Sequence, residues 1–189
     1  MLDMLEKLII ENCAPTLANL KTGEIVNFKF ENIEQARDEV RTLNRRLENR
    51  GVNLEILKER EKSMLLYVYR KNRLQQDLSC PMARSFLEQQ GYKHGRIENT
   101  VQFLKTRVNV VSRTAEFPHE IGLFLSYPIG DVLGFIENKG RNCRCCGYWK
   151  VYTEEEKAVS MFKKFDKCRD VYKKLCRQGA SINKLTVAC

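Results

Sequence analysis

Apolar residues recur along much of the chain at spacings of three and four, which is the period of a helix with one buried face. The clearest helix begins after Asn32, which with Gln35 forms a plausible N-cap, and ends at Gly51, which favours a left-handed C-terminal turn. Its apolar face comprises Ile33, Ala36, Val40, Leu43 and Leu47. This spacing predicts one amphipathic helix over 33–47.

The same criterion predicts helices on both sides of this segment. A first helix starts at Leu2 and stops near Ala14 and Pro15, because proline lacks a backbone N–H and disrupts a helix. A capping box formed by Thr153 and Glu156 predicts the start of a long helix that ends at Gly179. Further helices are expected over 74–78, 81–90, 97–111, 118–124 and 128–136.

Alternating apolar and polar positions predict strands over 24–30 and 52–56, and a β-prone apolar run predicts another over 64–69. The second and third are expected to form an antiparallel hairpin around the charged turn at 59–62. Two late strands are expected over 148–152 and 181–187. No linker, repeat or low-complexity segment divides the chain, so residues 1–189 are expected to form one α+β domain in which helices cover a small mixed β-sheet of about five strands.

Composition narrows the class of protein. The chain has 189 residues, of which 43% are hydrophobic and 30% charged, and it contains no run of about 20 apolar residues that could span a membrane. Its opening segment carries acidic residues where a signal peptide carries basic ones. We therefore expect a cytoplasmic protein without a membrane partner.

The formal net charge of +9 raises the question of whether the protein binds nucleic acid. Arg37, Arg41 and Arg45 recur every four residues on the predicted helix over 33–47, but Asp38 and Glu39 interrupt this basic face. No aromatic RNA-binding signature accompanies it. RNA binding through basic helices stays open as an alternative, although only weak, sequence-independent binding is expected.

Eight cysteines in a chain without a secretory signal predict reduced thiols rather than disulfides. Cys143, Cys145 and Cys146 form a C-x-C-C loop that offers soft metal ligands but lacks the paired C-x-x-C spacing of a structural zinc site. Arg141 and Arg144 are expected to lower thiol pKa values there. A thiol-dependent enzyme or redox protein is thus a second alternative, and these cysteines are weak metal candidates; no cofactor is expected.

A candidate pocket combines two segments, 119–127 and 146–152. Glycines there permit close approach, aromatic residues supply apolar walls, and a few polar groups are available to orient a ligand. The candidate pocket residues are His119, Glu120, Tyr127, Cys146, Tyr148 and Lys150. The alternative is that the same residues only pack a core.

No phosphate loop, dinucleotide fingerprint, serine elbow or H-E-x-x-H motif is present, so an enzyme is not favoured. The leading hypothesis is a cytoplasmic accessory protein that binds a small ligand or a protein partner.

Four stretches of the chain are distinctive: APTLANLKTG, FPHEIGLFLSYPIGDVLGFIENKG, CCGYWKVYTEEEKA and KLTVA. Together they resemble the bacterial family catalogued as domain of unknown function 3793, over nearly the whole chain. The resemblance implies a Firmicutes-type source and a small stand-alone cytoplasmic protein. It implies no reaction, cofactor or functional residue.

Overall fold

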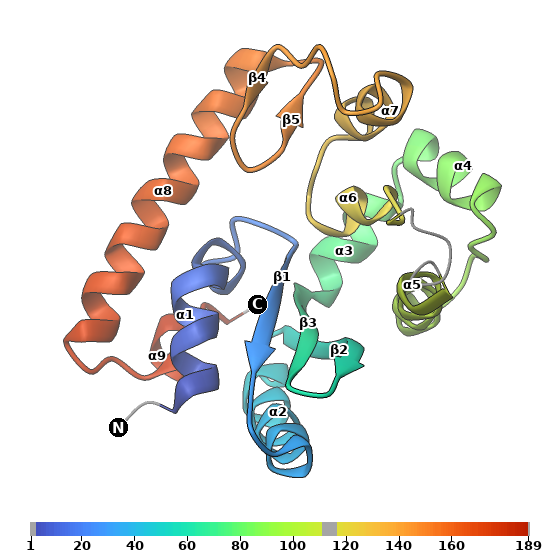
Figure 1. Ribbon diagram of the computed structural model, residues 1–189. Coiled ribbons are helices and arrows are strands. Elements are labelled where there is room, and N and C mark those ends of the chain that lie inside the picture. The colour runs from blue at the N-terminus through green and yellow to red at the C-terminus, as the bar shows by residue number, and fades with distance from the viewer. Residues whose placement is uncertain (1–2, 111–116, 189) are drawn as a thin grey trace.

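The computed structural model of the protein describes residues 3–110 and 117–188, so Leu2 and Val111, expected in helices, lie outside the described residues. Figure 1 shows helices arranged around two small sheets. In chain order the elements are α1 Met4–Leu17, β1 Gly23–Lys29, α2 Ile33–Glu48, β2 Val52–Arg60, β3 Ser63–Arg70, α3 Lys71–Leu78, α4 Pro81–Gln89, α5 Ile97–Val110, α6 Ile121–Phe124, α7 Ile129–Glu137, β4 Cys145–Cys146, β5 Lys150–Val151, α8 Glu155–Arg177 and α9 Ile182–Leu185.

The larger sheet has the strand order β1-β3-β2, and both pairs of neighbours are antiparallel. Side chains of β3 alternate between two cores, because successive residues of a strand point to opposite faces. Leu66 and Val68 pack with α1, α2 and α9. Tyr67 and Tyr69, on the other face, pack with α3, α4, α5 and α6. Both faces of the sheet are therefore covered by helices.

The expected single mixed sheet is wrong in two respects. The described strands form two separate sheets, and every described pair is antiparallel. Cys145 and Cys146, expected in a loop, form β4 and pair with β5, which spans only Lys150–Val151 of the predicted strand over 148–152. The strand count of about five and the α+β character agree with the expectation.

The closing segment over 181–187 does not form the expected strand; its residues Ile182–Leu185 form the short helix α9. Ile182 and Leu185 are buried three residues apart, which is helical spacing, and the Thr186 hydroxyl donates to the carbonyl oxygen of Ile182 at 2.7 Å. The predicted stop near Ala14 and Pro15 coincides with a kink rather than with the end of α1. The backbone angles at Cys13 are non-helical, and a further short helical segment carries α1 to Leu17.

The predicted caps had mixed outcomes. The Asn32 side chain accepts a hydrogen bond from the backbone N–H of Gln35 at 3.0 Å, so the cap of α2 is confirmed. The capping box of Thr153 and Glu156 is wrong. Helix α8 begins at Glu155, and the Thr153 hydroxyl donates instead to Asp131 at 2.8 Å.

A buried arginine ties the chain ends to the sheet. Arg70 is fully buried at the end of β3, and its guanidinium donates to the carbonyl oxygens of Thr16 at 2.6 Å, Leu17 at 2.6 Å and Val187 at 2.8 Å. A longer contact of 3.3 Å reaches the carbonyl oxygen of Arg50. These bonds satisfy carbonyls at the end of α1 that have no partner within the helix. No helix in the described ranges is long and apolar enough to cross a membrane.

Replacing Arg70 with Met is expected to lower the free energy of unfolding by about 3 kcal/mol or more, because several buried carbonyls lose their donor. Chemical denaturation measures this change. Arg45→Met is the matched control, since Arg45 is exposed on α2, and its effect should stay within about 0.5 kcal/mol. Equal effects of the two substitutions would contradict the role assigned to Arg70.

Candidate functional site

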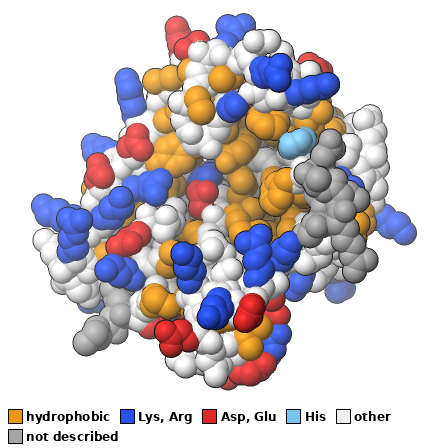
Figure 2. All heavy atoms as spheres, in the orientation of Figure 1, with side chains coloured by type: hydrophobic (Ala, Val, Ile, Leu, Met, Phe, Trp, Pro, Cys, Tyr) orange, Lys and Arg blue, Asp and Glu red, His pale blue; other side chains and the backbone are white. Residues whose placement is uncertain are grey.

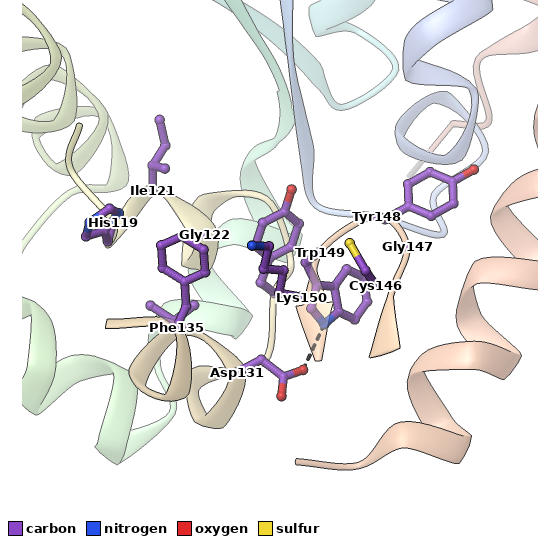
Figure 3. Close-up of a pocket in the computed structure, with 12 residues that line it drawn as sticks. His119, Ile121, Gly122, Asp131, Phe135, Cys146, Gly147, Tyr148, Trp149 and Lys150 are labelled. Carbon is purple, nitrogen blue, oxygen red and sulfur yellow. Dashed lines mark hydrogen bonds between the residues drawn. The ribbon is translucent and has the colours of Figure 1, made fainter. Parts of the chain in front are cut away.

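A cavity of about 350 Å³ lies between the α6–α7 segment and the β4–β5 hairpin (Figure 3). Apolar side chains gather in the central part of one face of the molecule, with lysine and arginine side chains around them (Figure 2). The cavity is lined by His119, Ile121, Gly122, Tyr127, Asp131, Val132, Phe135, Cys146, Gly147, Tyr148, Trp149 and Lys150. Residues more than 20 positions apart thus meet at one site.

One carboxylate joins the two halves of this cavity. Asp131 of α7 is 3% exposed, and it accepts a hydrogen bond from the indole Nε1 of Trp149 at 2.8 Å. Its other oxygen accepts from the backbone N–H groups of Tyr152 at 2.8 Å and Thr153 at 2.9 Å, and from the Thr153 hydroxyl. A buried carboxylate requires such compensation. Asp131 therefore acts as the link between α7 and the hairpin.

The walls of the cavity are mainly aromatic. The Tyr127 and Trp149 rings stack with centroids 5.2 Å apart and an interplanar angle of 30°. Trp149 also packs edge-on against Phe162 of α8, with centroids 4.6 Å apart. Burial, with a smaller contribution from Glu24, raises the pKa of Tyr127 to about 12, so its phenol stays protonated near neutral pH.

Two glycines permit this packing. A Cβ on Gly122 would lie 2.8 Å from a Val132 methyl carbon and 3.0 Å from the Tyr127 ring. A Cβ on Gly147 would lie 2.3 Å from the Phe162 ring. Since carbon atoms of side chains cannot approach so closely, this packing of the cavity walls requires a residue without a side chain at both positions.

Two cationic or potentially cationic groups stand at the edge of the cavity. The Lys150 ammonium donates to the carbonyl oxygen of Gly140 at 2.7 Å and lies 5.9 Å from the centroid of the Phe135 ring. The exposed His119 ring meets Phe135 edge-on, with centroids 5.1 Å apart. Figure 3 shows His119 and Phe135 on one side and Lys150 with Trp149 on the other. Within the described residues, neither Lys150 nor His119 forms an ion pair.

The structure brings together five of the six residues that the sequence suggested for a pocket. His119, Tyr127, Cys146, Tyr148 and Lys150 line the cavity. The Tyr148 ring, however, points away from the group drawn in Figure 3, toward α1 and α8.

Glu120 does not line this cavity. It is 2% exposed and accepts from the Arg107 Nε at 2.7 Å and from the Tyr92 hydroxyl at 3.4 Å. Hydrogen bonding by Glu120 raises the pKa of Arg107, and burial raises that of Tyr92. Adjacent residues in a helical turn point in different directions. His119 and Glu120 therefore serve different parts of the structure.

Sequence reasoning missed a buried lysine beside the cavity. Lys21 is fully buried in the loop before β1, and its Nζ donates to Glu24 at 2.5 Å. The same ammonium lies 5.7 Å from the Tyr127 ring centroid and 5.8 Å from that of Tyr148. Lysine is rarely buried, so a lone lysine between a predicted helix and a predicted strand carries no signal of such a role. Asp131 was also missed, although an acid within the apolar stretch over 129–136 was a usable signal.

Cys145 of the cysteine loop does not have the lowered pKa expected from the neighbouring arginines. Burial, followed by Glu155 and neighbouring thiols, raises the pKa of Cys145 above its ordinary value, so the expected lowering is wrong for this thiol. Cys146 is exposed and Cys143 is half-buried. No group of three or more His, Cys, Asp or Glu side chains within residues 3–110 and 117–188 is arranged to hold a metal ion.

Acidic residues offset part of the basic face of α2. Arg37 pairs with Glu34 and Glu59, each at 2.6 Å, and Arg41 pairs with Asp38 at 3.2 Å. Paired arginines offer a weaker field to phosphate groups than free ones.

Comparison with known proteins adds a family but no activity. A family model described as "Protein of unknown function (DUF3793)" matches residues 9–186, which confirms the resemblance seen in the sequence. No curated protein and no solved structure matches the chain.

Glu120→Gln is expected to lower the free energy of unfolding by about 1 to 3 kcal/mol, because the buried end of the Arg107 pair loses its charge. His119→Gln and Lys150→Gln should change it by no more than about 0.5 kcal/mol, since both side chains are exposed. Thermal and chemical denaturation compare the three variants. Equal losses in all three would show that the cavity edge is structural.

The thiols are expected to differ in reactivity. Iodoacetamide should alkylate exposed Cys80 and Cys146 before Cys145, because a raised pKa leaves less of the reactive thiolate at neutral pH. Mass spectrometry of peptides taken during the reaction gives the order. Preferential modification of Cys145 would instead show that Arg141 and Arg144 activate it.

Proposed function

The chain belongs to the DUF3793 family of proteins of unknown function, and we propose from the geometry of the site that it is an accessory protein that binds a small, planar, anionic ligand. The ligand occupies the cavity between the α6–α7 segment and the β4–β5 hairpin.

The observation that carries this proposal is an aromatic-walled cavity with cationic chemistry at its edge. Its volume of about 350 Å³ falls within the range of small-molecule sites. Tyr127, Trp149 and Phe135 offer ring faces and edges, and aromatic rings pack favourably against planar ligands. A flat, largely apolar ligand body therefore suits the walls.

Charge at the cavity favours an anion. The Lys150 ammonium is bonded to a neutral carbonyl, so its charge remains available to a ligand. Both oxygens of Asp131, the lining carboxylate, are already occupied by hydrogen bonds. A negative group on the ligand would contact the Lys150 ammonium. The His119 ring, on the other side of Phe135, would be its second contact.

Two other functions have less support. A thiol-dependent enzyme would use Cys146, which is exposed and lines the cavity, but the ring of His119, which also lines it, packs against Phe135. An RNA-binding function would use α2, where two of the three aligned arginines are paired with acids. A protein partner would use the same surface, but a concave cavity suits a small molecule better.

Two fluorescent probes with the same rings test the proposal. Anilinonaphthalene sulfonate carries a negative group, and N-phenylnaphthylamine does not. The native protein is expected to bind the sulfonate at least about tenfold more tightly, which corresponds to about 1.4 kcal/mol. Lys150→Met should remove most of this preference, and Phe135→Ala should weaken the binding of both probes.

Lys174→Met is the control, because Lys174 is an exposed lysine near the end of α8. Fluorescence titration of all variants, with circular dichroism to confirm folding, gives the affinities. The proposal fails if neither probe saturates the native protein, or if Lys174→Met changes the preference as much as Lys150→Met does.

A further inference from the structure

A second cavity, of about 470 Å³, shares Tyr127 and Trp149 with the first but opens between α3 and α8. Its apolar lining includes Leu123 and Phe165, both buried. Leu20 and Met161 also line it, although they are 40% and 41% exposed. Covering large, exposed apolar side chains with a ligand removes apolar surface from water, which contributes favourably to the free energy of binding. The apolar part of this cavity therefore suits an aliphatic or aromatic group.

The polar edge of the same cavity is formed by two opposite charges that are kept apart. Arg73 and Asp77 are one turn apart on α3, a spacing at which an arginine and an aspartate commonly pair. Yet in the described part of the chain they do not form an ion pair with each other. Each is held by neutral groups instead.

For Arg73, the neutral partners are backbone carbonyl oxygens. Its Nη1 donates to Asn19 at 2.9 Å and its Nη2 reaches Leu20 at 3.5 Å, while its Nε is buried without a hydrogen-bond partner among the described residues. A guanidinium carries five N–H donors, so these contacts leave capacity for a ligand carboxylate. The charge of Arg73 is not neutralised by these carbonyls.

For Asp77, the neutral partners are hydroxyl groups. One carboxylate oxygen accepts from the Thr22 hydroxyl and from the Ser126 hydroxyl, the latter at 3.4 Å. Ser126 itself has a positive φ of 63°, and its Oγ accepts from the backbone N–H of Thr22 at 2.7 Å. A strained backbone held by such bonds fixes the position of Asp77 relative to the cavity.

We propose that this second cavity binds a free amino acid with a large apolar side chain. The α-carboxylate would pair with Arg73, the α-ammonium with Asp77, and the side chain would cover the apolar wall that includes Leu123 and Phe165. Opposite charges on adjacent positions of one small molecule match opposite charges one helical turn apart. Either end of a peptide, a fatty acid or an amine supplies only one of the two charges. This site does not depend on the function proposed for the first cavity.

The single tryptophan of the chain lines this cavity and reports on its occupancy. Titration of the intact protein with L-leucine is expected to change the Trp149 fluorescence and to saturate. Leucine amide, which lacks the carboxylate, and N-acetyl-leucine, which lacks the ammonium, should each bind at least about tenfold more weakly, a difference typical of one lost charged contact. Glycine, which lacks the apolar side chain, should not saturate.

Two variants that remove one charge each assign the charges. Arg73→Gln should abolish the preference of the protein for leucine over leucine amide, and Asp77→Asn should abolish its preference for leucine over N-acetyl-leucine. Each variant should retain binding of anilinonaphthalene sulfonate if the first cavity is intact. This readout separates failure of the second site from failure of the first.

Met161→Arg provides a test that does not disturb the polar edge, because Met161 is exposed on α8 and its replacement would obstruct the cavity. Val171→Arg is the control, since Val171 is a 47% exposed apolar residue of the same helix outside both cavities. Leucine binding should be lost only in Met161→Arg. The proposal is overturned if leucine does not saturate the native protein, if leucine and both analogues bind equally, or if Val171→Arg and Met161→Arg behave alike.

Discussion

The candidate site depends on one buried carboxylate. Asp131 joins α7 to the indole of Trp149 and to the backbone just before α8, so a single side chain sets the distance between the α6–α7 segment and the β4–β5 hairpin. The hairpin itself contains only two pairs of residues, and so short a sheet is not stable alone. Its position therefore depends on contacts outside the hairpin, chief among them those of Asp131 and the packing of Trp149 on α8.

Three buried charges share a common pattern in this protein. Arg70 is held by backbone carbonyls, Asp131 by N–H and hydroxyl donors, and Lys21 by Glu24 and two tyrosine rings. Burial of a charge is unfavourable unless hydrogen bonds or an opposite charge compensate it. Each charge has at least one partner in a distant segment, and for Lys21 these partners are the two tyrosine rings. Each charge therefore fixes the relative position of parts of the chain that local structure alone leaves undetermined.

The sequence predicted what depends on local periodicity and missed what depends on these long-range contacts. The cap at Asn32 and the central hairpin follow from neighbouring residues, and both are present. The segment over 181–187 was assigned to a strand because its packing against α1 is not visible in its own pattern. The position of Glu120 next to His119 suggests a place in the pocket, but its buried carboxylate pairs instead with the partly exposed Arg107, 13 residues earlier in the chain.

The most direct measurement concerns the indole N–H of Trp149, which gives a single resonance because the chain contains one tryptophan. If Asp131 holds the hairpin in place, this proton exchanges slowly with solvent in the native protein, and Asp131→Ala makes its exchange fast while α1, α2 and the larger sheet stay folded. An indole proton that exchanges as fast as that of free tryptophan in the native protein, or one whose exchange Asp131→Ala leaves unchanged, would contradict this account of the site.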